Sequence, residues 1–114
     1  MIKIPPKELA IDISKRSTCR VKVGSVIEDK NGIFSWGWNH MGLIGLGCCA
    51  EAHAISRANP KRLKGSTIYI AGTHRKTGNP VPAKPCYHCH KLILHVGIEE
   101  VIWQDKYLWE VYYV

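Results

Sequence analysis

Three cysteines in two short segments have the spacing of a zinc site. Cys86 and Cys89 are three positions apart, so on one helical turn both sulfurs can reach one ion, and Cys49 begins an alanine-rich segment that favours a helix. Zinc prefers a tetrahedron of sulfur and nitrogen ligands, and a catalytic zinc keeps the fourth position open. Helix starts also lower the pKa of a thiol and favour the thiolate that binds metal. We therefore expect Cys49, Cys86 and Cys89 to bind Zn²⁺.

A glutamate close to Cys49 points to catalysis rather than to a structural metal alone. Glu51 lies two positions after Cys49, which is about 200° around a helix, so it can avoid coordination and approach a water beside the ion. Zinc lowers the pKa of such a water toward neutrality, and a carboxylate that takes the proton can return it to a reacting ring. We expect Glu51 to be a proton shuttle.

Other interpretations of these residues stay open at this level. Without Cys49 and Glu51, the pair Cys86 and Cys89 would fit a redox pair or half of a structural zinc site equally well. A zinc-stapled structural domain without activity is a further alternative, although it leaves Glu51 without a purpose. Cys48 would lose the two-residue offset to Glu51, so we expect it to be a packed or spectator thiol.

The first half of the chain predicts a helix, a hairpin and a second helix. Modest apolar periodicity predicts the helix over 7–16. Alternation over 21–27 and a β-rich run over 33–38 flank the turn residues of 29–32, which predicts two antiparallel strands. The alanines of 49–58 favour the second helix, and an Asn-Pro pair ends it.

The second half predicts three more strands and a third helix. We expect a buried strand over 67–71, a long polar loop over 72–84, a helix over 85–97, and strands over 100–103 and 107–114. Too few residues separate the last two strands for a parallel crossover, so they must be antiparallel neighbours. The order predicts a single domain over 1–114, a three-layer α/β/α fold with a five-stranded mixed sheet whose strands 4 and 5 are antiparallel.

The two motifs resemble those of a known family. Cys49-Ala50-Glu51 and Pro85-Cys86-Tyr87-His88-Cys89 are similar to the paired [His/Cys]-Ala-Glu and Pro-Cys-x-x-Cys motifs of the zinc-dependent cytidine deaminase superfamily. Segments 23–26, 37–39 and 97–101 resemble the family's first, second and fourth strands. A lone Cys-x-x-Cys would be a weak signal, whereas two motifs in the right order across these elements are a strong one.

The resemblance implies an activity and a set of site residues. The activity is hydrolytic deamination of a cytosine base to uracil with release of ammonia, with Zn²⁺ as the cofactor. Cys49, Cys86 and Cys89 would bind the zinc, and Glu51 would carry the protons. The substrate-binding set is Asn39 at the sugar, the Ala50 backbone at the base, His53 as a donor one turn after Cys49, and Pro85 beside the second motif.

The substrate signals of this resemblance conflict. Three cysteine ligands and a terminal hairpin resemble the free-nucleoside deaminases, but Asn39-His40-Met41 lacks the glutamate with which those enzymes hold the sugar. Gly37-Trp38-Asn39 looks closer to the nucleotide and polynucleotide branches. We expect a (deoxy)cytidine nucleoside or nucleotide substrate, with single-stranded DNA or RNA as the alternative.

Charge and hydropathy narrow the partners further. The 114-residue chain carries 16 Lys and Arg against 9 Asp and Glu, a formal charge of +7 that favours encounters with phosphate. Its apolar runs never approach the ~20 residues needed to cross a bilayer, and residues 1–9 lack the apolar region of a signal peptide. We expect a cytoplasmic protein without membrane contact. Small members of the family it resembles commonly assemble, which implies a homo-oligomer.

Several further segments are candidates for substrate contact. Glycine-rich residues 40–47 precede the first motif and would form a substrate-shaping loop. The cations within 57–64 fit a solvated helix end or a phosphate site, and those of 74–76 lie on the loop before the second motif. Trp36, Trp38 and Trp103 are most simply packing residues, with a base-stacking wall formed by one of them as the alternative.

Overall fold

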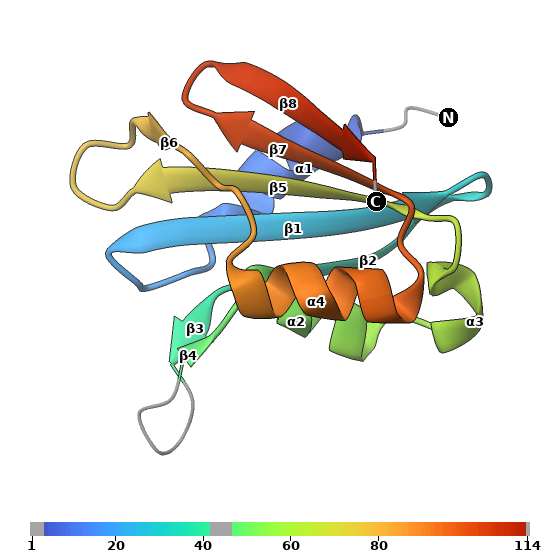
Figure 1. The fold of residues 1–114 in the computed structure, drawn as a ribbon. Coiled ribbons are helices and arrows are strands. Elements are labelled where there is room, and N and C mark those ends of the chain that lie inside the picture. Colours follow the sequence, from blue (N-terminus) through green and yellow to red (C-terminus); the bar gives the residue numbers. More distant parts are fainter. Residues whose placement is uncertain (1–3, 42–46, 114) are drawn as a thin grey trace.

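The computed structural model describes residues 4–41 and 47–113 (Figure 1). Helices and strands alternate along these residues much as the sequence predicts. None of the described helices has the length and apolar character that crossing a bilayer would require. Within the described ranges, the helices are α1 (Pro6–Ser14), α2 (Ala50–Arg57), α3 (Pro60–Leu63) and α4 (Tyr87–Val96).

A mixed sheet forms the middle of the molecule. Its strands lie in the order β2-β1-β5-β7-β8, with β6 paired to the outer end of β5, and a separate two-stranded ladder joins β3 to β4. The strands of the main sheet are β1 (Val21–Asp29), β2 (Gly32–Trp38), β5 (Thr67–His74), β6 (Pro80–Val81), β7 (Glu100–Asp105) and β8 (Leu108–Tyr113). The small ladder pairs β3 (His40–Met41) with β4 (Gly47–Cys48).

The strand directions confirm the mixed sheet. β1 pairs antiparallel with both β2 and β5, whereas β5 pairs parallel with β7. The parallel pair requires a crossover, and α4 supplies it. β8 returns antiparallel beside β7, as the short connection between them predicts.

Helices cover both faces of this sheet and complete the three layers (Figure 1). α1 packs on one face so closely that a Cβ on Gly24 would lie 2.2 Å from the Ala10 carbonyl oxygen. α2 approaches the other face at Gly37, where a Cβ would lie 2.4 Å from the Ala54 amide nitrogen. The larger apolar core lies between the sheet and α2, α3 and α4, with Ile27, Ile70 and Ile93 fully buried in it.

The sequence predictions for the connections were partly wrong. The sheet has six strands rather than the predicted five, because part of the predicted loop 72–84 forms backbone hydrogen bonds. β5 continues to His74 beside β1, and Gly72 of β5 pairs with Val81 of β6. The short helix α3 was not predicted, and the Asn59 side chain caps it by accepting from the Lys61 N–H at 3.0 Å. The helix predicted over 7–16 ends at Ser14.

Candidate metal centre and active site

The three predicted cysteines converge where two helices begin. Cys49 immediately precedes α2, Cys86 immediately precedes α4, and Cys89 lies in the first turn of α4. Their three sulfur atoms all lie within 4.8 Å of one another. Tetrahedral coordination at a Zn–S distance of about 2.3 Å separates the ligand sulfurs by about 3.8 Å, so this cluster needs only small adjustments to hold the ion. A set of three soft sulfur donors with a fourth position free fits zinc.

Two buried serines of the sheet fix the start of α2. The Ser25 hydroxyl donates to the Ala50 carbonyl oxygen at 2.7 Å, and the Ser35 hydroxyl donates to the Ala54 carbonyl oxygen at 2.6 Å. Both serines are buried, so these bonds are sheltered from water. Together with the close approach at Gly37, they set the position of Cys49 and Glu51 relative to the sheet.

Glu51 lies in a cleft beside the cysteines. Glu51 is only 5% exposed, and this burial raises the pKa of its carboxyl group. Hydrogen bonds to the carboxylate from its own backbone and from the Cys89 thiol lower the pKa and so oppose the effect of burial. The cleft has a volume of about 180 Å³. It is lined by Val23, Asn39, Cys49, Ala50, Glu51, Pro82, Ala83, Lys84 and Cys86.

The thiols differ in their electrostatic surroundings. Burial raises the pKa of Cys89, and the neighbouring Glu51 charge adds to this effect. Burial also raises the pKa of Cys49, opposed by Cys89. The pKa of Cys86 is lowered because the backbone amide of Cys89 stabilises its thiolate at the start of α4. Three thiolates beside a carboxylate repel one another, and a divalent cation would compensate that charge.

Asn39 reaches the cleft and also joins two strands. Its Oδ1 accepts from the Val23 N–H at 2.8 Å, and its Nδ2 donates to the Val21 carbonyl oxygen at 2.7 Å. These bonds leave one N–H and one lone pair of the amide for other partners. The family resemblance implies that Asn39 contacts the substrate, and the structure adds that the backbone of β1 holds its side chain in place.

His53 and Pro85, also predicted as substrate-binding residues, do not line this cleft. The His53 Nδ1 accepts from the Trp38 N–H at 3.2 Å, and its ring packs edge-on against the rings of Trp38 and His40. Burial lowers the pKa of His53. Pro85 faces a neighbouring cavity. His53 therefore joins α2 to the end of β2, one residue before Asn39.

Some contributions to the cleft were missed. Lys84, directly before the Pro85-Cys86 motif, is a cationic lining residue that its place next to the motif could have indicated. Val23, Pro82 and Ala83 line the cleft only because β1 and the segment after β6 meet there. Of the loop predicted over 40–47 to shape the substrate site, residues 42–46 lie outside the described residues.

The sequence matches a known family over most of its length. Residues 7–105 match the family described as the cytidine and deoxycytidylate deaminase zinc-binding region, a match that includes all three cysteines and Glu51. The chain belongs to this family. The cofactor of this family is zinc, and the cluster of Cys49, Cys86 and Cys89 could hold the ion.

Individual relatives of this deaminase family agree with that assignment. The human deoxycytidylate deaminase is 39% identical over 61 residues, which are 53% of this chain but 28% of the human protein. The deoxycytidylate deaminase of Mus musculus matches with the same identity and coverage. The aligned segment thus spans less than a third of these relatives.

Solved structures share the fold at low sequence identity. A cytidine deaminase from Burkholderia pseudomallei superposes with a TM-score of 0.73 at 21% identity, covering 95% of this chain and 89% of the other. The dCMP deaminase of the cyanophage S-TIM5 superposes with a TM-score of 0.69 at 23% identity, covering 90% and 81%. The fold predicted from the sequence is therefore the fold observed.

Proposed function

We propose that this protein catalyses the hydrolytic deamination of the cytosine ring of a (deoxy)cytidine nucleoside or nucleotide. One observation carries the proposal: a buried glutamate, Glu51, lines the same small cleft as Cys49, which precedes α2, and Cys86, which precedes α4. Membership of the deaminase family supports the reaction class. The names of its relatives, which include both cytidine and deoxycytidylate deaminases, support the substrate class.

The metal would be held by the sulfurs of Cys49, Cys86 and Cys89. A Zn²⁺ bound there supplies Lewis acidity, which brings the pKa of water toward neutrality. The surroundings favour such an ion at Cys86, because the backbone amide of Cys89 stabilises the Cys86 thiolate. The cleft opens beside the cysteines, so water and a planar ring can both reach the cluster.

Glu51 would move the protons of the reaction. The oxygen of water adds to C4 of the cytosine ring, and the Glu51 carboxylate takes the proton that this water loses. Glu51 then gives this proton to the ring nitrogen. In a second transfer it takes the remaining proton from the hydroxyl now on C4 and passes it to the amino group, as the carbonyl of uracil forms, the C4–N4 bond breaks and ammonia leaves. Burial raises the pKa of Glu51, which suits a group that must both accept and release a proton.

The cleft would hold the ring rather than a whole nucleotide. Its volume of about 180 Å³ is below the usual size of a ligand pocket. Ala50 is the first residue of α2, so its N–H has no acceptor within the helix and is available to the base. The remaining N–H of Asn39, which lines the cleft, would donate to the sugar.

Assembly and compartment belong to the same proposal. We infer a homo-oligomer because the edge strand β8 leaves Leu108, Val111 and Tyr113 exposed, at 70%, 51% and 72%. We also infer a reducing compartment such as the cytoplasm, since Cys19, Cys48, Cys49, Cys86 and Cys89 are all free thiols.

Ammonia release over a panel of substrates tests the function. The panel contains cytidine, deoxycytidine and their 5′-monophosphates, with adenosine and guanosine as ring controls. We expect the purified protein to release ammonia from at least one cytosine compound and to yield the matching uracil compound in equal amount. A zinc-loaded, folded protein that releases ammonia only from a purine would refute the proposal.

A further inference from the structure

A second cavity lies beside the cleft and is the larger of the two. Its volume is about 290 Å³, against about 180 Å³ for the cleft. The deaminase reaction described above makes no use of it. We call it the aromatic hollow; it is lined by Lys84, Pro85, Tyr87, His90, Val101, Trp103 and Tyr112.

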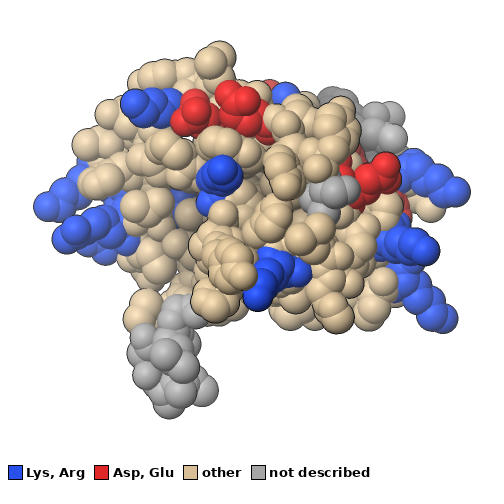
Figure 2. Space-filling model, viewed as in Figure 1, with Lys and Arg blue, Asp and Glu red and all other residues tan. Residues whose placement is uncertain are grey.

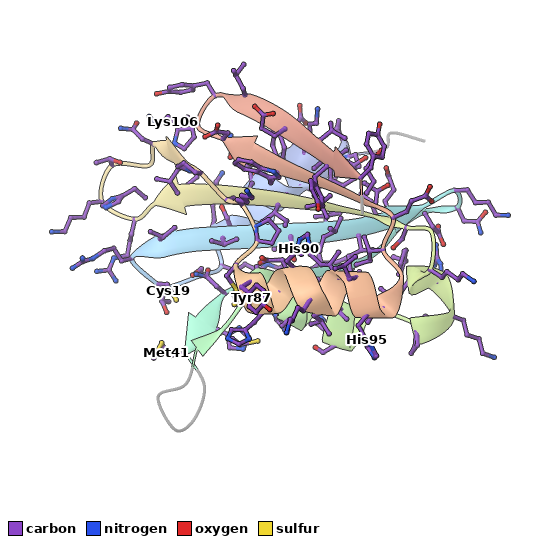
Figure 3. All side chains as sticks on the ribbon, viewed as in Figure 1. Cys19, Met41, Tyr87, His90, His95 and Lys106 are labelled. Carbon is purple, nitrogen blue, oxygen red and sulfur yellow. The ribbon has the colours of Figure 1, made fainter. Side chains whose placement is uncertain are left out.

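Aromatic rings form the walls of this hollow. Trp103 comes from β7 and Tyr112 from β8. Tyr87 and His90, which Figure 3 labels, come from the first half of α4. The His90 and Tyr112 rings have centroids 5.4 Å apart, which links α4 to β8 across the hollow. Tyr87 is 68% exposed and Tyr112 is 47% exposed, so both can receive another ring. Every nucleobase has a face that stacks on such rings.

The hollow also carries positive charge. Lys84 lines it, and the Lys91 ammonium lies 4.7 Å from the centroid of the Tyr87 ring. No acidic side chain is among its described lining residues, and Glu110, the cross-strand neighbour of Trp103, is not part of the lining. Figure 2 shows basic side chains over α4 and over the segment that leads into it. These charges suit a ligand that bears phosphate.

Lys84 joins the hollow to the cleft. Ala83, Lys84 and Cys86 line the cleft, whereas Lys84, Pro85 and Tyr87 line the hollow, so consecutive residues separate the two cavities. Two residues of extended chain span about 7 Å. Two adjacent nucleotides of one strand can therefore place one base beside the cysteines and the other in the hollow, with Lys84 between them.

We propose that the substrate is a short single-stranded oligonucleotide rather than a mononucleotide, an inference that rests on the proposed deaminase function. The reacting cytosine occupies the cleft, a neighbouring nucleobase stacks in the aromatic hollow, and the phosphodiester between them contacts Lys84. Because the hollow would contact only the flat face of the stacked base, it can accept any of several kinds of nucleobase.

The first test compares kcat/KM for deoxycytidine monophosphate with that for a tetranucleotide containing one cytosine. We expect the wild-type protein to favour the tetranucleotide by about tenfold or more. Tyr87→Ala, at an exposed position that leaves the core intact, lowers this preference by about tenfold, in keeping with the loss of one stacked base. Tyr107→Ala, at an exposed tyrosine of the turn between β7 and β8 and outside the lining, keeps it.

A binding measurement separates this proposal from the proposed function. A fluorescently labelled thymidine tetranucleotide contains no cytosine, so its dissociation constant reports on the hollow even if the protein deaminates nothing. We expect Tyr87→Ala and Lys84→Gln each to weaken binding about fivefold or more. Added salt should also weaken binding to the wild-type protein, with the logarithm of the binding constant falling linearly with the logarithm of the salt concentration. Circular dichroism confirms that each variant is folded.

Three results would overturn the inference. They are equal kcat/KM for the mononucleotide and the tetranucleotide, equal thymidine tetranucleotide binding by Tyr87→Ala and the wild-type protein, or equal losses in Tyr87→Ala and Tyr107→Ala. Absence of deamination with every cytosine substrate would instead refute the proposed function, and the thymidine measurement would still decide whether the hollow binds single strands.

Discussion

Asn39 and Val23 are joined by two hydrogen bonds, one through the side chain and one through the backbone. The Val23 N–H donates to the Asn39 Oδ1 at 2.8 Å, and the Asn39 N–H donates to the Val23 carbonyl oxygen at 3.1 Å. Both residues line the cleft. This wall of the site is therefore held by the pairing of β1 with the end of β2, and a change at Asn39 affects stability and the site together.

The Asn39 side chain predicts a graded loss of stability. Asn39→Ala removes both side-chain bonds to β1 and leaves a backbone donor at Val23 and an acceptor at Val21 without that partner, at a cost of about 1–3 kcal/mol. Asn39→Asp keeps the acceptor for Val23 but loses the donor to Val21, so its loss should be smaller. Urea denaturation measures both. Equal stability of Asn39→Ala and the wild-type protein would contradict the role of the amide.

The close approach at Gly37 predicts a larger effect from a smaller change. A Cβ added there would lie 2.4 Å from the Ala54 amide nitrogen and 2.8 Å from the Ala50 carbonyl oxygen, both of them backbone atoms. Gly37→Ala should therefore push α2 from the sheet and cost about 2–3 kcal/mol. Because α2 carries Cys49 and Glu51, zinc affinity should fall as well. Lys30→Ala, in the exposed turn between β1 and β2, is the control and should change neither quantity.

The ion pair of Asp29 and Arg62 predicts a pH dependence of stability. Hydrogen bonding to the Arg62 guanidinium, at 2.7 Å from both carboxylate oxygens, lowers the pKa of Asp29 to about 2 from an ordinary 3.8. The carboxylate is charged in both states above pH 4, so its contribution is complete there and is lost as the pH falls through 2. The advantage of the wild-type protein over Asp29→Asn in urea should shrink between pH 5 and pH 2.

A comparison at the protein surface controls for this result. Asp12→Asn removes an exposed carboxylate 3.4 Å from Lys15 within α1. Exposed pairs of this kind contribute little to stability, so this variant should follow the wild-type pH profile. If Asp29→Asn and Asp12→Asn behaved alike at every pH, the pair across β1 and α3 would have no special role.

Adjacent cysteines provide a matched test of the metal site. Cys49 belongs to the sulfur cluster, whereas Cys48, the preceding residue, does not. Cys49→Ser should lose most of its bound zinc and have a lower melting temperature, because bound metal stabilises the folded state. Cys48→Ser should keep about one zinc per chain by elemental analysis. Retention of full zinc by Cys49→Ser would show that the ion is bound elsewhere.

Local sequence signals were sufficient for most of the fold. Alternation and turn residues predicted the β1–β2 hairpin, and the short connection predicted the antiparallel β7–β8 pair. The two motifs also predicted that Cys49, Cys86 and Cys89 would meet, because each lies in or just before the first turn of a helix. Such features depend on neighbouring residues, which a sequence displays directly.

Features that depend on distant partners could not be predicted. β6 is two residues long and exists because Val81 finds Gly72 of β5. Arg62, grouped in the sequence with a solvated basic cluster, instead pairs with Asp29 and lies 4.3 Å from the Phe34 ring. Likewise, Lys84 enters the cleft because the segment after β6 crosses the end of β1. Each case is set by contacts between residues far apart in the chain.

The proposed function requires Glu51 to carry protons beside a zinc ion held by three cysteines. The most direct measurement is the rate of cytosine deamination by Glu51→Gln, determined together with its zinc content. Glutamine keeps the shape of the buried side chain but cannot accept the proton, so we expect about one zinc per chain and a kcat at least about a hundredfold below wild type. A zinc-loaded Glu51→Gln protein with wild-type kcat would contradict it.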